Sequence, residues 1–142
     1  MRTLLAGLIA AVICVASALP SGAAPTPPQT VAGGILPVGQ NLHYYCHWTQ
    51  RFGGGIAWTG DLKFSVNADG IVNGTYRSNS VRPDPFYGKI VTVTGGVTGT
   101  NIRLSFGIVP NISVRGTVAN NAITGATQYN GGTLEFVADP SH

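Results

Sequence analysis

The strongest constraint on the fold is an apolar pattern that repeats at every second residue. Between Ile56 and Val66, large apolar side chains alternate with polar ones. In an extended strand Trp58, Leu62 and Phe64 would lie on one face, and the polar residues between them on the other. The pattern therefore predicts a strand with one buried and one exposed face.

Similar segments follow along the chain, separated by short turn sequences. Asn67-Ala68-Asp69-Gly70 is typical of a hairpin turn, because Asp-Gly accepts the positive φ angles that such a turn needs. Comparable turn residues stand at 53–55, 99–101, 120–121 and 130–132, and no segment after residue 40 has a helical pattern. About eight strands are expected, at 42–50, 56–66, 71–78, 89–98, 102–106, 112–118, 123–128 and 133–138.

Consecutive short strands with local connections predict an all-β fold, a small antiparallel up-and-down β-barrel of about eight strands. Closure removes the exposed edges that promote aggregation. A two-sheet sandwich or an open meander remains the alternative, with the loop at 82–85 as its longer connection. The glycines within strands suit the bends of a small barrel: Gly60, Gly74, Gly95, Gly116 and Gly125.

The N-terminal residues have the pattern of a secretory signal peptide at 1–18, with an apolar run that ends in Ala16-Ser17-Ala18. The run is too short to span a bilayer, so we expect a secreted or periplasmic product with no membrane insertion after cleavage. A Pro-, Ala- and Gly-rich extended arm is predicted at 19–40, the barrel domain at 41–139 and a C-terminal tail at 140–142.

Composition and charge favour an exported protein and argue against a nucleic-acid partner. Only 9% of the 142 residues are charged and 44% are hydrophobic, which is atypical of a cytosolic helical domain or a disordered chain. Cleavage removes Arg2, leaving 7 of the 8 basic residues against 5 acidic ones, a net charge of +2. The basic residues are scattered singly, so we expect no nucleic-acid partner.

The residues with metal-binding or redox chemistry form no complete set. Cys46 is the one cysteine left after cleavage, and we expect a buried thiol; an intermolecular disulfide or a ligand role stays open. His43 and His47 share a strand face from which Cys46 points away, and two histidines alone make a weak metal site. Neither a metal nor a cofactor is expected.

Catalytic sets are also incomplete. No serine lies in a nucleophile-elbow context, and once turn, loop and terminal carboxylates are set aside, Asp61 and Glu135 remain as acids. We therefore expect a protein that is not an enzyme.

A barrel of about eight strands is just wide enough to be filled by side chains or to hold one small ligand. We predict ligand contacts at Trp58, Asp61, Tyr76 and Ser78, with Arg77 and Asn79 nearby. Aromatic residues that could line the interior are Trp48, Trp58, Phe64, Tyr76, Phe86, Tyr87, Phe106 and Phe136.

Two family resemblances accompany this prediction. The segments 58–62, 66–70 and 74–78 resemble the opening hairpin of the avidin and streptavidin family, and Tyr76 and Ser78 fall on its biotin-contacting positions. Lys63 and Phe64 stand where that family has Gly-Ser. Fainter is the likeness of Tyr44-Tyr45-Cys46 and the segment 73–76 to bacterial lysozyme-inhibitor barrels.

The expected function is that of an exported, non-enzymatic binding protein that holds a small ligand in or at the mouth of a barrel. The alternative is an exported structural or protein-interaction module, such as an inhibitor or a surface component, with a filled core.

Overall fold

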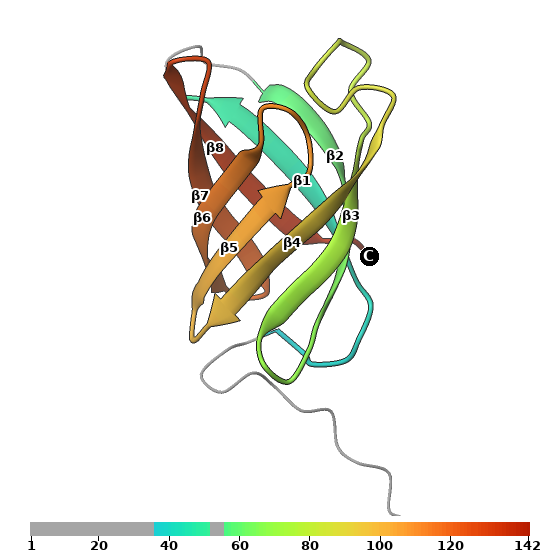
Figure 1. Cartoon of the computed structure of the whole chain (residues 1–142), viewed down its shortest axis with the longest axis vertical. Coiled ribbons are helices and arrows are strands. Elements are labelled where there is room, and N and C mark those ends of the chain that lie inside the picture. The colour runs from blue at the N-terminus through green and yellow to red at the C-terminus, as the bar shows by residue number, and fades with distance from the viewer. Residues whose placement is uncertain (1–35, 52–55) are drawn as a thin grey trace, which may run out of the picture.

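The computed structural model describes residues 36–51 and 56–142, which form eight antiparallel strands closed into one barrel (Figure 1). Each strand pairs with the next along the chain, and β1 also pairs with β8. The predicted up-and-down barrel is confirmed, and the sandwich alternative is wrong. The strands are β1 (Leu42–Gln50), β2 (Ile56–Val66), β3 (Ile71–Ser78), β4 (Ile90–Thr98), β5 (Asn101–Phe106), β6 (Ile112–Ala119), β7 (Ala122–Tyr129) and β8 (Gly132–Pro140).

The turn residues take the backbone conformations that their sequences predict. Asn120 and Asn121 have φ angles of 50° and 63°, as a tight hairpin turn requires. Gly70 has a φ of 78°, and the side chain of Asn67 accepts hydrogen bonds from the backbone N–H groups of Asp69 and Ile71. These local preferences fix the strand ends. The turn predicted at 53–55 lies outside the described residues.

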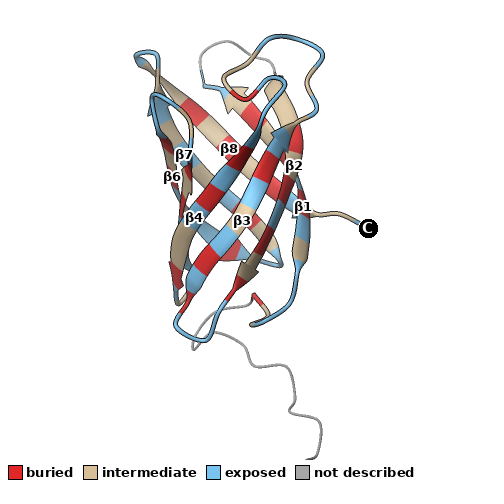
Figure 2. Ribbon diagram, turned by 45° about the vertical axis from the view of Figure 1, so that its right-hand side comes forward, coloured by how far each residue is buried: buried red, intermediate tan, exposed pale blue. Residues whose placement is uncertain are grey.

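The core fills the inside of the barrel with alternate side chains from every strand. Figure 2 shows buried and exposed segments alternating along β3 and β4. Among the described residues, no buried side chain belongs to a polar or charged residue. On β2 the predicted inner face is confirmed for Leu62, Phe64 and Val66, whereas Trp58 is half-buried.

Both ends of the domain differ from the predicted bounds. Leu36 is fully buried and the N–H of Gly39 donates to the carbonyl of Val66, so packing begins before residue 41. An open barrel end exposes apolar interior, which the side chain of Leu36 covers. At the other terminus Pro140 pairs with Tyr44 instead of lying in a free tail. The predicted signal peptide 1–18 and the first part of the arm, 19–35, lie outside the described residues.

Within those residues, no helix has the length and apolar character that crossing a bilayer would need.

Candidate functional site

One end of the barrel collects most of the predicted ligand contacts, and we call it the mouth. It is formed by Trp48 of β1, Trp58 of β2, Tyr76 and Ser78 of β3, and the loop 79–89 that joins β3 to β4. Antiparallel order brings these positions together, because the last part of β1 and β3 lies beside the first part of β2. Loop 79–89 is the yellow-green connection at the upper end of the barrel in Figure 1.

A buried hydrogen bond lies inside the mouth. The indole Nε1–H of Trp48 donates to the hydroxyl of Tyr76 at 3.1 Å, and both side chains are fully buried. The hydroxyl fits because Gly60 lies beneath it; a Cβ at Gly60 would collide with the Tyr76 ring and oxygen. Burial raises the pKa of Tyr76, with a smaller contribution from Cys46. Tyr76 therefore stays neutral and can both accept and donate.

Phe86 closes the mouth from above. This side chain belongs to loop 79–89, yet it is fully buried among the aromatic residues of the barrel. Its ring centroid lies 4.8 Å from that of Tyr76, 5.6 Å from Phe106 and 5.7 Å from Trp48. The interior at this end is thus filled by a side chain that comes from a loop.

Asp84 holds the loop in this closed arrangement. Its carboxylate accepts a hydrogen bond from the backbone N–H of Phe86 at 2.7 Å and another from the hydroxyl of Ser78. Apart from the bond to Ser78, the hydrogen bonds described for residues 81–89 stay within the loop. In the sequence Asp84 is a loop carboxylate, and its place two residues before Phe86 is typical of an Asx turn.

Trp58 adds a second indole to the mouth. Its ring centroid lies 5.9 Å from that of Trp48 and 6.0 Å from Tyr129. Its Nε1–H is buried and has no hydrogen-bond partner among the residues that the structure describes. A buried donor without an acceptor is unfavourable, so an acceptor atom placed here would be stabilised.

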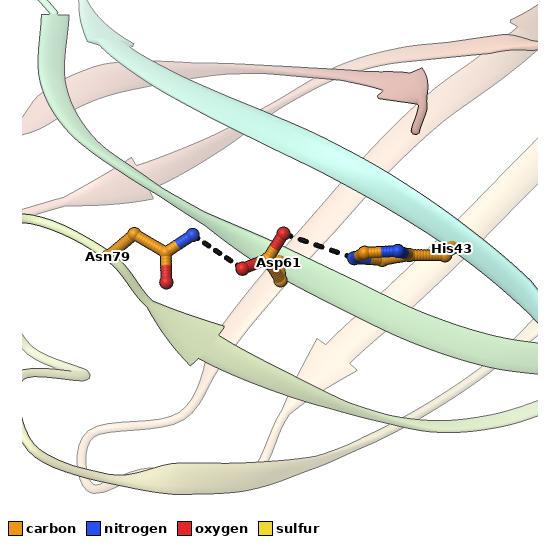
Figure 3. A network of polar contacts seen from close by, with 3 residues as sticks. All are labelled: His43, Asp61 and Asn79. Carbon is orange, nitrogen blue, oxygen red and sulfur yellow. Dashed lines mark hydrogen bonds and ion pairs between the residues drawn. The ribbon is translucent and has the colours of Figure 1, made fainter. Parts of the chain in front are cut away.

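Asp61 is not part of the mouth. It lies on the outer surface of β2, because its neighbours Gly60 and Leu62 point inward and successive side chains alternate. Its carboxylate bonds to Nε2 of His43 at 3.1 Å and to the side-chain amide of Asn79 (Figure 3). Asp61 thus lies on the polar face of β2, as the alternation predicts, and its side chain does not lie beside Tyr76 in the interior. Arg77 is exposed as well.

Of the four predicted contacts, the fold thus brings Trp58, Tyr76 and Ser78 together and places Asp61 elsewhere. Most of the predicted lining aromatics face the interior, but Tyr87 does not, because it follows Phe86 in the loop and is 54% exposed.

The predicted buried thiol is confirmed, since Cys46 is fully buried and free. Burial raises its pKa well above the ordinary value, and the nearby Asp61 and Asp139 raise it further. His43 is exposed on the opposite strand face, as predicted. Within the described part of the chain no three His, Cys, Asp or Glu side chains come close enough to hold a metal ion.

Comparison with known proteins gives one weak similarity. No family model and no curated protein matches the chain. The crystal structure of the rhizavidin–biotin complex is similar, with a TM-score of 0.43 and 18% sequence identity. The match covers 70% of this chain and 98% of rhizavidin.

Proposed function

We propose that this protein is an exported, non-enzymatic binding protein that takes a small, flat, largely apolar ligand into the mouth of its barrel. The observation that carries the proposal is that Phe86, a fully buried side chain of the core, belongs to loop 79–89 and not to a strand. A core side chain supplied by a loop can leave the barrel without breaking any strand pairing. The space that Phe86 vacates would be lined by aromatic rings from β1, β3 and β5.

The polar groups at the mouth indicate the kind of ligand. Trp58 offers an indole N–H that has no partner among the described residues, and the Tyr76 and Ser78 hydroxyls lie at the same end of the barrel. These groups are neutral and mostly donors, so they suit a ring that carries a carbonyl or similar acceptor oxygen. Asp84 is already engaged by Ser78 and by the loop backbone. The arrangement favours binding over acid–base catalysis.

Export rests on the sequence of residues 1–18, which end in Ala16-Ser17-Ala18. With export, a ligand-binding protein would meet its ligand outside the cytoplasm.

The first experiment is mass spectrometry of small molecules that co-purify with the protein from its native source. A compound found in this way is titrated into the apo protein while tryptophan fluorescence reports on Trp48 and Trp58. Phe86→Ala should bind it more tightly, because nothing has to be displaced. Tyr76→Phe should bind it about tenfold more weakly, which corresponds to about 1.4 kcal/mol. Asp61→Asn, on the outer surface, should bind it unchanged.

Toluene provides a second probe that needs no natural ligand. Phe86→Ala should bind toluene in the vacated space, as apolar cavities of this kind do. Tyr87→Ala is the matched control, since Tyr87 lies in the same loop but is exposed. If no compound co-purifies and toluene binds neither variant, the mouth does not hold a ligand.

A second candidate function is protein interaction, and exposed apolar residues favour it. Val81, Tyr87 and Ile90 are 93%, 54% and 70% exposed, and all three lie in or directly after loop 79–89. Substituting all three residues by Ser should abolish the binding of a protein partner and leave the side chains of the mouth unchanged. A loss of partner capture with normal ligand binding would separate the two functions.

A further inference from the structure

Two arginines lie directly opposite each other on the outside of the barrel. Arg103 of β5 and Arg115 of β6 are register partners, and both side chains are exposed. Like charges at directly opposite positions of an antiparallel pair are destabilising. The fold therefore places two guanidinium groups together although this arrangement alone weakens it.

None of the strands β4 to β7 carries an acidic residue that could compensate them. The sequence has no Asp or Glu between Phe86 and Leu134, a range that includes all of β4 to β7. The next positions across the sheet are Gly96 of β4 and Ala126 of β7, which carry no charge. The nearest acid in this row is Glu135 of β8, beyond Ala126, and its carboxylate pairs with Arg51 at 3.1 Å. The neighbours along the two strands on the same face are Asn101, Ser105, Ser113 and Thr117.

The surface is also hollowed at the arginines. A depression of about 480 Å³ is lined by both guanidinium-bearing residues together with Thr98, Asn101 and Gly96. A second depression, of about 250 Å³, lies on the other side of Arg115 and includes Gln128. Small and neutral polar side chains thus leave both arginines open to a ligand.

We propose that Arg103 and Arg115 form a binding site for an oxyanion, a phosphate, sulfate or carboxylate group. A guanidinium group presents paired N–H donors that match two oxygens of such a group, and these charged hydrogen bonds are among the strongest in proteins. A bound anion would also remove the repulsion between the two cations. The site lies on the outer wall of β5 and β6, so it is separate from the mouth and does not depend on the proposed function.

The site is tested by NMR titration of amide resonances in the protein that begins at Leu19. Inorganic phosphate and sulfate should shift the amides around Arg103 and Arg115 saturably, and sodium chloride at equal ionic strength should not. Arg103→Gln and Arg115→Gln should each bind phosphate at least about tenfold more weakly. Arg82→Gln is the matched control, because it removes one exposed positive charge in loop 79–89 and should bind as the unaltered protein does.

Glucose 6-phosphate, with glucose as its control, distinguishes the sources of the anion. Tighter binding of the ester than of inorganic phosphate supports a site for an anionic group on a larger molecule. Equal binding supports a site for the free anion.

Thermal unfolding separates binding from a structural role. In chloride, the melting temperature of Arg103→Gln should equal or exceed that of the unaltered protein. Phosphate should raise the melting temperature of the unaltered protein and leave that of Arg103→Gln unchanged. Arg103→Glu should form a cross-strand ion pair with Arg115, melt higher and lose phosphate binding. Arg103→Lys keeps the charge without the paired donors, so it should fold normally and bind more weakly.

Three results would overturn the proposal. The first is an equal response to phosphate and chloride. The second is unchanged phosphate binding in both glutamine variants. The third is a lower melting temperature of Arg103→Gln in chloride, since that would mean that the two arginines do not repel each other.

Discussion

The indole N–H of Trp48 donates to the hydroxyl of Tyr76 at 3.1 Å inside the barrel, where both side chains are fully buried. The two residues belong to β1 and β3, which are separated by β2, so the bond crosses the interior and does not follow a strand ladder. It satisfies two polar groups that burial removes from water. The same bond places both aromatic rings against Phe86.

Tyr76→Phe should lower the free energy of unfolding by about 1–3 kcal/mol, because it leaves the Trp48 N–H buried without an acceptor. Chemical denaturation measures the change. A double-mutant cycle with Trp48→Phe should give a coupling energy of at least about 0.5 kcal/mol. Strictly additive effects of the two substitutions would show that the bond does not contribute.

Phe64→Ala should cost about 3–5 kcal/mol, since the Phe64 ring is buried in the barrel and its loss leaves a cavity. Trp58→Ala should cost less, because Trp58 is only half-buried at the mouth. Denaturation midpoints of the two variants test this order. Equal losses would mean that Trp58 is covered as completely as Phe64.

Stability should fall at alkaline pH. Burial raises the pKa of Cys46 well above its ordinary value of 9.0 and the pKa of Tyr76 above 10.0. Above pH 9 the unfolded chain therefore loses protons that the folded protein keeps. The stabilisation is complete below pH 9 and decreases as pH rises, by up to about 1.4 kcal/mol per pH unit for each group.

Cys46→Ala is the control for this pH dependence. It should flatten the decrease between pH 9 and 10, where the thiol ionises first, and leave the tyrosine-dependent decrease above pH 10. A stability profile that is level from pH 8 to 11 in the unaltered protein would contradict the prediction.

Asn121→Val should destabilise the turn between β6 and β7 by about 1–2 kcal/mol, because Asn121 has a φ of 63° that a β-branched residue avoids. Asn121→Gly should be neutral or stabilising, since glycine accepts this conformation readily. Thermal melts compare the two variants. If they melt alike, the turn adopts another conformation in solution.

The exported protein should begin at Leu19, after cleavage behind Ala18. N-terminal sequencing of secreted material gives the answer. An intact Met1 in the exported pool would remove the sequence argument for the compartment.

The sequence determined the strands and the turns between them, and it favoured a closed barrel over a sandwich. The bounds predicted for the first three strands coincide with β1 to β3, and the later ones differ only at their ends. These features are local: apolar alternation sets which face of a strand is buried, and Asp-Gly or Asn-Asn sets where the chain turns. The alternation also fixes Asp61 on the face away from Leu62, so its outer position was readable from β2 alone.

Tertiary structure decided how the mouth is filled and which charges meet. Loop 79–89 has no periodic pattern, so nothing local says that Phe86 turns inward while Tyr87 remains exposed. The bond from Trp48 to Tyr76 and the pairing of Arg103 with Arg115 depend on strand register, which joins residues far apart in the chain. The register depends on the packing of the whole barrel, because the inward side chains of each strand must pack against those of the other seven strands.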